Sequence, residues 1–229
     1  MNLNEMIYHR KSCRSFTGVP VDAETIEKIL SFDRKPLYPD IKVHWEIVPR
    51  NQVKCICPWT TPQLITIYSE ETEGYLENIG FLFQQMDLYL QTLGLGVCWL
   101  GMGRMNPKTA VTVEGMKFVI MLAFGHPKGD QLRHDFKGFK RKSLAQIADT
   151  PDPGLEPARL APSAVNSQPW YFTHEGDTIH VYCSRKGSRL DAGIALAHLY
   201  VANEETFHFF KADHITDLPG YNYIGSVNL

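Results

Sequence analysis

The sequence predicts an α+β protein built from two related lobes, each with strands and a core helix. In the first lobe, the strand Ile65–Tyr68 precedes a long apolar helix that begins Asn78-Ile-Gly80. In the second lobe, the strand Ile179–Tyr182 precedes, at nearly the same distance, an apolar helix that begins Asp191-Ala-Gly193. The recurrence of strand, loop and helix, with glycine at the third position, indicates an internal duplication.

Two unrelated helix starts would give the same pattern, so the glycines provide a test. If the repeat is real, we expect Gly80 and Gly193 to let the two core helices cross closely, because glycine has no Cβ. The helix Asn78–Leu93 is apolar around much of its circumference. A helix of this kind is buried on most sides, so we expect it at the centre of the fold.

The other elements of the first lobe, residues 1–148, follow from caps and apolar spacing. Leu3, Met6 and Ile7 form one helix face that Asn2 or Asn4 caps. Asp22 caps a helix from about Ala23 to Phe32, and its inward side chains are Ile26, Ile29 and Leu30. Further strands are expected at Val43–Val48, Gln63–Tyr68, Val97–Leu100 and Lys117–Phe124. Ser143 caps a short helix, Leu144–Ala148.

The second lobe, residues 149–229, begins at Asp149–Pro153, a segment with two prolines. A short helix, Leu155–Ala161, occupies the place that the helix after Asp22 has in the first lobe. Strands are expected from Trp170 and at Thr178–Cys183, and a helix from about Ala192 to Phe210. For the tail Asp213–Leu229 we expect coil with an edge strand at most.

Composition excludes several classes of function. The chain has 229 residues, 44% of them hydrophobic, and a net charge of −2, which argues against non-specific nucleic-acid binding. No apolar run approaches the roughly 20 residues of a membrane-spanning helix, and Met1–Arg10 does not resemble a signal peptide. Five scattered cysteines without a C-x-x-C motif are typical of reduced thiols, so we expect a cytoplasmic protein.

Cys55-Ile-Cys57 is open to more than one interpretation. The pair could be a redox pair or half of a metal site. No matching cluster of His or Cys follows it, so an ordinary pair on a strand or loop is favoured and no metal site is expected.

A polar loop joins the short helix to the aromatic strand of the second lobe, within Ala158–Phe172. Pro162 ends the helix, and Pro169 holds Gln168 extended. Between them lie Ser163 and Asn166. Amide side chains present donors and an acceptor together, which suits the edge of a planar heterocycle. The alternative is a capped turn before an aromatic strand.

Two clusters of positive charge are candidate phosphate sites. Arg10-Lys11-Ser12-Cys13-Arg14-Ser15-Phe16 offers three cations and two hydroxyls, and Lys140-Arg141-Lys142 forms the second cluster. Charge-assisted hydrogen bonds from such groups to a phosphate stabilise it by roughly 1.5–3 kcal/mol each. The alternative is a solvated basic surface.

Together these pieces resemble the nitroreductase family of FMN-dependent oxidoreductases. The residues Arg10–Phe16 look like the family's N-terminal basic motif, and Ala161–Phe172 look like its Pro-Ser-x-x-Asn-x-Gln-Pro-Trp motif. Gly94–Gly101, with the later Phe-Gly-His-Pro and a basic stretch, look like its C-terminal portion. The resemblance implies a nitroreductase-like fold of antiparallel or mixed sheets with core helices.

The resemblance also implies which residues bind FMN. Arg10, Lys11 and Ser12 would contact the phosphate and ribityl groups, and Arg14 would lie near the pyrimidine carbonyl. Leu100 and Gly101 would run along the ring. Lys140, Arg141 or Lys142 would complete the phosphate site. The second lobe would line the ring with Pro162, Ser163, Ala164 and Asn166, while Gln168 serves either the ligand or the loop.

The order of the motifs departs from the family's pattern. The Pro-Ser-x-x-Asn motif usually precedes the core helix in the first third of the chain, but here it lies in the second copy of the repeat. The first copy reads Asp33-Arg-Lys-Pro-Leu-Tyr-Pro-Asp40 at that place. Family members are homodimers with FMN at the interface, so this chain resembles such a dimer fused into one polypeptide, as in a divergent subgroup. The arrangement implies one flavin site per chain, in a monomer with an internal pseudo-dimer or in a homodimer.

The chemistry implied is hydride transfer from NAD(P)H through FMN to a small acceptor such as a nitroaromatic or a quinone. No dedicated catalytic residue is needed, and His126 is interpreted as a turn residue rather than a proton donor. A flavin-binding protein without turnover is the alternative from a different class, and a phosphate-ligand module without flavin is a third.

Overall fold

The structure is a computed structural model that describes residues 1–55, 59, 61–110, 112–135 and 140–229. Its internal contacts divide the chain into two units. Unit 1 comprises Met1–Tyr75 and Met86–His134, and unit 2 comprises Leu76–Gln85 and Asp135–Leu229. The main boundary thus falls earlier than the 148/149 junction expected from the prolines. Cys57, half of the expected cysteine pair, lies outside the described residues.

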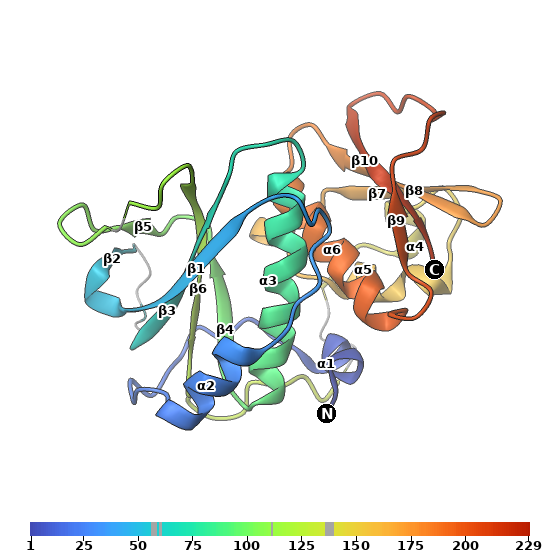
Figure 1. Ribbon diagram of the computed structural model, residues 1–229. Helices are drawn as coiled ribbons and strands as arrows, with labels where there is room; N and C mark the ends of the chain where they lie inside the picture. The colour runs from blue at the N-terminus through green and yellow to red at the C-terminus, as the bar shows by residue number, and fades with distance from the viewer. Residues whose placement is uncertain (56–58, 60, 111, 136–139) are drawn as a thin grey trace. The chain divides into compact units, whose positions relative to one another are not determined.

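Unit 1 is organised around a four-stranded antiparallel sheet in the order β1-β3-β6-β4 (Figure 1). Its strands are β1 (Val43–Pro49), β3 (Gln63–Ser69), β6 (Lys117–Gly125) and β4 (Gly96–Leu100). Strand β3 is buried along most of its length. The helices are α1 (Leu3–His9), α2 (Ala23–Ser31) and the C-terminal part of α3 (Tyr75–Thr92), and two short strands, β2 (Val53–Lys54) and β5 (Arg104–Met105), pair separately.

The caps predicted for unit 1 are present. Asn2 and Glu5 form a reciprocal capping box at the start of α1. The Asp22 side chain accepts the N–H of Thr25 at 2.9 Å and so starts α2. Ile29 of α2 is fully buried, but Leu30, which we expected to face inward, is 56% exposed.

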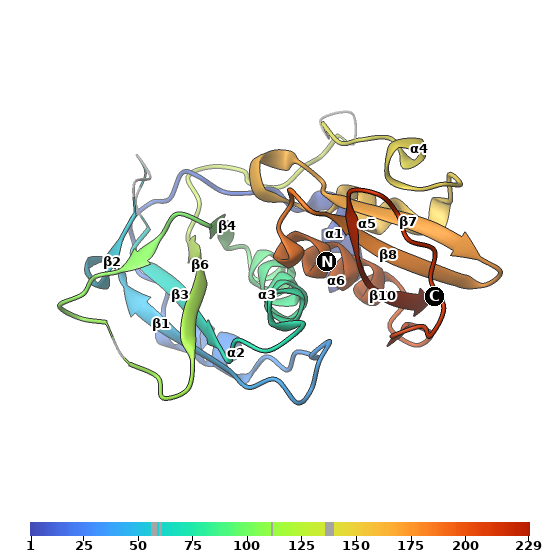
Figure 2. The same ribbon diagram turned by 90° about the horizontal axis from the view of Figure 1, so that it is seen from above.

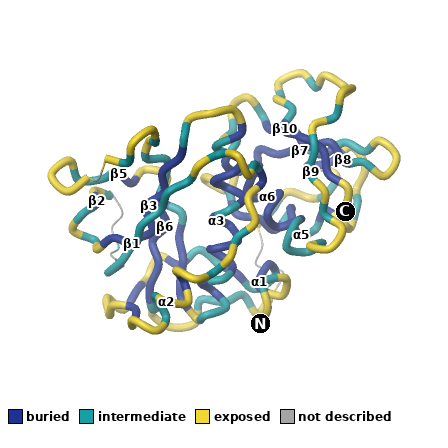
Figure 3. Tube along the Cα trace, viewed as in Figure 1, coloured by how far each residue is buried: buried dark blue, intermediate teal, exposed yellow. Residues whose placement is uncertain are grey.

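Unit 2 contains a second four-stranded antiparallel sheet in the order β7-β8-β10-β9. Its strands are β7 (Trp170–Glu175), β8 (Thr178–Ser184), β10 (Tyr221–Asn228) and β9 (His208–Phe210). The helices are α4 (Leu144–Ile147), α5 (Glu156–Leu160) and α6 (Arg189–Ala202). Figure 2 shows α5 and α6 beside this sheet, and Figure 3 shows α6 buried along most of its length.

The two sheets have the same topology, which confirms the duplication. In each, two consecutive strands pair, a core helix follows, and the next two strands join so that the last strand lies second from the edge. By this order β1, β3, β4 and β6 correspond to β7, β8, β9 and β10. All strand pairings described are antiparallel, which confirms the α+β class.

The predicted close crossing of the core helices is also confirmed, and it lies inside unit 2, which contains the first turns of α3. A Cβ built on Gly80 would lie 2.1 Å from the carbonyl oxygen of Leu190. A Cβ built on Gly193 would lie 2.1 Å from the carbonyl oxygen of Glu77. The contact is reciprocal, as expected of equivalent positions in two copies, and it excludes any larger residue.

Two predictions for the end of the chain were wrong. Helix α6 ends at Ala202, and His208–Phe210 form the edge strand β9 rather than the last turn of a helix. The tail supplies β10, an inner strand, not coil with an edge strand. Both errors have one cause, because β9 forms only by pairing with β10, which follows it in the chain and could not be recognised from local pattern.

Candidate functional site

The N-terminal basic segment of unit 1 lies beside strand β4. Ser12 forms a parallel bridge with Val97, and the Cys13 N–H donates to the carbonyl of Val97 at 2.7 Å. Cys13 is buried against Gly96, where a Cβ would come within 2.5 Å of the Cys13 sulfur. Glycine at this position therefore lets the segment approach the sheet, and Arg14 remains exposed.

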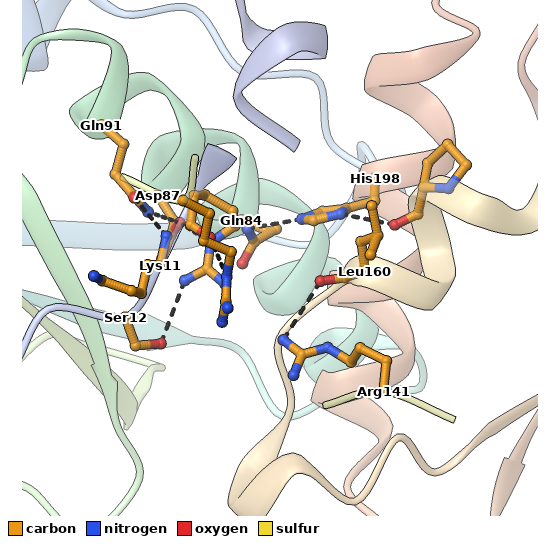
Figure 4. Close-up of polar contacts among 11 residues, drawn as sticks. Lys11, Ser12, Gln84, Asp87, Gln91, Arg141, Leu160 and His198 are labelled. Atoms are coloured by element: carbon orange, nitrogen blue, oxygen red, sulfur yellow. Dashed lines mark hydrogen bonds and ion pairs between the residues drawn. The ribbon is translucent and has the colours of Figure 1, made fainter. Parts of the chain in front are cut away.

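Two residues of helix α3, Asp87 and Gln91, contact Arg10 and the residue that follows it. Its side chain is 2% exposed, and Nε lies 3.0 Å from Oδ1 of Asp87, which is fully buried. Gln91, one turn later, donates to Asp87 at 2.7 Å and accepts the Lys11 N–H at 3.1 Å (Figure 4). The guanidinium Nη2 lies 3.4 Å from the Ser12 hydroxyl. Helix α3 thus fixes both the backbone of the segment and the direction of its first arginine.

Arg133 is a cation of this site that the sequence analysis missed. Its Nε donates to the Arg10 carbonyl at 3.3 Å, and its N–H donates to the carbonyl of His9 at 2.7 Å. Partial burial and the neighbouring Arg10 charge lower the pKa of the Arg133 guanidinium. Two neighbouring guanidiniums favour an anionic ligand. The only signal in the sequence is the place of Arg133 in the basic segment 131–142.

Leu100 and Gly101, at the end of strand β4, follow the residue of that strand that Ser12 contacts. Leu100 is buried, whereas Gly101 begins an exposed turn closed by the Gly103 N–H on the Leu100 carbonyl at 3.3 Å. Burial raises the pKa of the Cys98 thiol, two residues earlier, to about 11, and the positive charges of Arg14 and Arg10 oppose that rise. A Cβ on Gly101 would meet nothing within 4 Å.

The polar loop of unit 2 has a strained backbone. Val165, Asn166 and Gln168 adopt φ values of 48°, 59° and 44°. Left-handed conformations in non-glycine residues cost on the order of 1–3 kcal/mol each, and they cluster at functional sites. For a β-branched residue such as Val165, which is 98% exposed, the conformation is a true outlier. Contacts elsewhere in unit 2 must hold the loop in this shape.

Gln168 provides the first of these contacts. It is fully buried, its Nε2 donates to the Arg159 carbonyl at 2.9 Å, and its Oε1 accepts the Lys142 N–H at 2.6 Å. Its own N–H donates to the Ser163 hydroxyl at 2.9 Å, and its carbonyl accepts Nζ of Lys142 at 2.9 Å. Both amide atoms of Gln168 are engaged by the protein, so this residue serves the loop.

The basic cluster 140–142 contacts the same loop. Asn166 donates through Nδ2 to the Lys140 carbonyl at 2.6 Å and accepts from the Arg141 guanidinium. Arg141 also reaches the Leu160 carbonyl at 3.5 Å (Figure 4). The contacts of Lys140, Arg141 and Lys142 therefore support the loop, and a phosphate contact by this cluster stays a prediction. Pro162 is buried at the start of the loop, while Ala164 is exposed.

Helix α6 holds the loop from within unit 2. The Ala164 N–H lies 3.2 Å from each carboxylate oxygen of Asp191, which is 3% exposed. Burial raises the pKa of Asp191 to about 6, and the hydrogen bond from Ala164 opposes that rise. In the sequence Asp191 marks only the repeat, and no local pattern indicates its contact with Ala164, 27 residues away.

A second polar cluster lies outside the predicted residues, beside a cavity of about 350 Å³ in unit 2. His180 bridges Ser226 Oγ at 2.7 Å and Glu175 at 3.0 Å, and the Tyr223 hydroxyl lies 2.6 Å from Ser226. The set resembles a Ser-His-acid triad, but Ser226 is fully buried and its hydroxyl already has two partners. It cannot reach a substrate, so the cluster supports the sheet rather than hydrolysis.

Two broader expectations concern metals and membranes. In the described parts of the chain, no group of three or more His, Cys, Asp or Glu side chains is arranged to hold a metal. A search of the same residues found no helix with the length and apolar character needed to cross a membrane.

Comparison with known proteins identifies the fold and the family. No curated protein matches the chain. The family model described as "Putative TM nitroreductase" matches residues 2–203. The crystal structure of a putative nitroreductase from Thermotoga maritima is 22% identical, with a TM-score of 0.71, and the match covers 99% of this chain and 92% of that chain.

Shorter structures match part of the chain. A nitroreductase family protein from Clostridium difficile is 16% identical with a TM-score of 0.50, covering 64% of this chain and 96% of that one. An FMN-dependent nitroreductase from the same species is 19% identical with a TM-score of 0.46, covering 62% of this chain and 99% of that one. The full-length structural match establishes the nitroreductase fold, and the match of the family model to most of the residues shows that the chain belongs to the Putative TM nitroreductase family.

Proposed function

We propose that this chain is an FMN-dependent oxidoreductase that passes a hydride from NAD(P)H to a small acceptor of nitroaromatic or quinone type. The observation that carries the proposal is the pair of arginines in unit 1. Arg133 lies beside Arg10 and donates to its carbonyl, Nη2 of Arg10 lies 3.4 Å from the Ser12 hydroxyl, and Arg10 pairs with the buried carboxylate of Asp87. A phosphate dianion suits this donor set, because guanidiniums and hydroxyls bind its oxygens through charge-assisted hydrogen bonds.

The residues of each unit fit a different part of FMN. In unit 1, Arg14 is exposed and pairs with no carboxylate among the described residues, so it offers positive charge to a ring that gains electrons. In unit 2, the strained loop presents the exposed residues Ala164, Val165 and Asn166 to a ligand. That both groups contact one flavin stays a prediction.

In the proposed reaction the cofactor supplies the chemistry and the residues of the chain bind and orient it. When bound, FMN supplies the hydride chemistry, accepting from a nicotinamide and donating to an acceptor. Arg10, Ser12 and Arg133 would hold the phosphate end, and the space beside Gly101, directly after β4, is open because a Cβ there would meet nothing within 4 Å. No acid or base of the chain is assigned, since water can supply the protons.

The test is an absorption spectrum of the purified protein, before and after addition of NADH or NADPH under anaerobic conditions. The proposal expects a yellow protein, or one that turns yellow on reconstitution with FMN, and bleaching by at least one nicotinamide. Bound flavin that stays oxidised with both nicotinamides would identify a flavin-binding protein without turnover. A colourless protein that takes up no FMN would refute the proposal.

A further inference from the structure

The loop 162–168 keeps an unfavourable backbone shape, and hydrogen bonds from two directions hold it. The three left-handed residues are Val165, Asn166 and Gln168. The segment 140–142 holds the second half of the loop through Asn166 and Gln168. The first half, where the chain enters the strained region, is held by the Ala164 N–H on the Asp191 carboxylate.

Asp191 is an unusual acceptor for this purpose. It lies in the first turn of α6, is 3% exposed, and forms no ion pair among the described residues. The nearest arginine on the helix, Arg189, pairs instead with Glu77. An unpaired buried carboxylate is unfavourable, and replacement by a neutral residue would remove that penalty. The presence of a carboxylate at position 191 is therefore not explained by a contribution to folding stability.

The internal repeat supplies a comparison. The reciprocal crossing of Gly80 and Gly193 places Asn78 and Asp191 at equivalent positions, each two residues before its glycine. Asn78 is fully buried, as is the equivalent acid. The copy that lacks the Pro-Ser-x-x-Asn motif thus has a neutral amide, and the copy that carries the motif has the charge.

We propose that Asp191 is the positioning residue of the flavin-facing loop: its ionised carboxylate binds the Ala164 N–H and keeps residues 163–168 in the shape that binds ligand. Only the identity of the ligand rests on the proposed function. The held loop itself is a property of unit 2 alone.

The proposal makes the loop sensitive to pH. The Cys183 thiol of β8 faces Asp191, and it also faces Glu77 of α3 and Arg189 of α6, which pair with each other. Burial, with Asp191 and Glu77 nearby, raises the pKa of Cys183 to about 12, so this thiol stays neutral. Burial raises the pKa of Asp191 to about 6. A hydrogen bond to a charged acceptor is about twice as strong as one to a neutral acceptor, so the loop should loosen as Asp191 gains a proton.

The experiment measures amide hydrogen exchange of the peptide that covers residues 162–169, without flavin, between about pH 5 and pH 8. Protection factors correct for the intrinsic pH dependence of exchange. For the wild type, protection should fall about fivefold on acidification through pH 6. Asp191→Asn should show the lower protection at every pH with no midpoint, and Asp191→Ala should show the least. Asp177→Asn, in the exposed β7–β8 turn, is the matched control and should behave as the wild type.

FMN affinity measured over the same pH range completes the test. Loss of affinity in Asp191→Ala, with partial recovery in Asp191→Asn, supports the proposal, and Asp191→Asn covers the case in which Asp191→Ala does not fold. Wild-type protection in both variants, or an unchanged pH midpoint in Asp191→Asn, overturns it. If protection behaves as expected and no form binds FMN, the proposed function fails and the role of Asp191 in the loop stands. If both variants bind FMN as the wild type does, the proposed function stands and Asp191 does not position the loop for the ligand.

Discussion

The two copies of the repeat share a topology and differ in what their core helices carry. The sheets β1-β3-β6-β4 and β7-β8-β10-β9 have the same chain order. The offset that aligns Gly80 with Gly193 also aligns the buried Asp87 with Tyr200, which is half-buried, and Gln91 with the exposed Glu204. Helix α3 therefore continues as a polar support for Arg10 and Lys11, whereas α6 ends at Ala202.

The loops before the first strand of each sheet also differ, but here the second copy carries the additional polar features. In unit 2 the loop carries strained residues and is held by Asp191, Lys142 and Arg159. The corresponding stretch of unit 1 has lost the Pro-Ser-x-x-Asn motif, and its core helix carries Asn78 in place of the acid. Duplication kept the apolar framework, and a few polar residues on each core helix decided what each copy presents.

The largest effect is expected for Asp87→Ala, which removes the polar support found only on α3. Arg10 would remain charged and buried without its partner, which typically costs about 3–5 kcal/mol of unfolding free energy. Urea denaturation measures the loss. Glu204→Ala, at the position in the second copy that corresponds to Gln91, is the control and should change stability by less than about 0.5 kcal/mol. A loss below about 1 kcal/mol for Asp87→Ala would contradict the buried ion pair.

Gly193→Ala tests the feature that the copies share. The new Cβ would meet the backbone carbonyl of Glu77 at 2.1 Å, and backbone cannot move aside cheaply. We expect a loss of about 3 kcal/mol, and a similar loss for Gly80→Ala. Gly101→Ala, where a Cβ meets nothing within 4 Å, is the matched control in thermal unfolding of the flavin-free protein. Stabilisation by Gly193→Ala, as helix propensity alone would give, would show that the helices do not cross there.

Asp191→Asn makes the second copy resemble the first at the position of Asn78. The folded pKa of Asp191 is raised from 3.8 to about 6, so its ionised form costs stability above pH 6 and costs none below about pH 4. The variant should gain about 1–3 kcal/mol at pH 7.5. The gain should disappear at pH 4. Denaturation at the two pH values measures the difference, and an equal gain at both would assign the effect to packing rather than charge.

Arg133→Ala tests the anion site that only the first copy supports. Since Arg133 and Arg10 are proposed to bind phosphate, the wild type should bind FMN more tightly than riboflavin. The variant should lose about tenfold in FMN affinity and little in riboflavin affinity. Fluorescence titration with both flavins gives the two affinities. Lys108→Ala, an exposed cation of unit 1, is the control. Equal losses of affinity for FMN and riboflavin would show that Arg133 does not bind the phosphate.

The smallest effect concerns the start of the second copy. Partial burial lowers the pKa of His174, but hydrogen bonds to Asp149 and Asp152 outweigh it and raise this pKa above 6.5. A raised histidine pKa stabilises the fold below about pH 6.5, and the contribution is lost as pH rises through the folded value. Because these groups are partly exposed, we expect His174→Gln to cost at most about 1 kcal/mol at pH 6 and nothing at pH 8.5. A loss of stability that is the same at both pH values would show that the charge of His174 does not stabilise the fold.

Local pattern by itself determined much of this protein. The strand–helix repeat, the caps of α1, α2 and α4, and the glycine crossing depend on residues whose conformational preferences act within one turn or one contact. The motifs also indicated the family that the family model then showed, because the basic N-terminal segment and the amide-bearing loop resemble family motifs residue by residue. Pattern reading failed where an apolar run such as Phe207–Phe210 suits either helix or strand.

Tertiary structure alone decided which polar residues hold the candidate site. No local pattern in the sequence marks the partners of Asp87, Arg133 and Asp191, because each contact joins residues far apart in the chain. The same applies to β9, an edge strand that exists through pairing with β10 from the tail. The fold shows that Gln168 and residues 140–142 hydrogen-bond within the loop region, which the sequence left open for Gln168, while a phosphate contact by 140–142 stays a prediction.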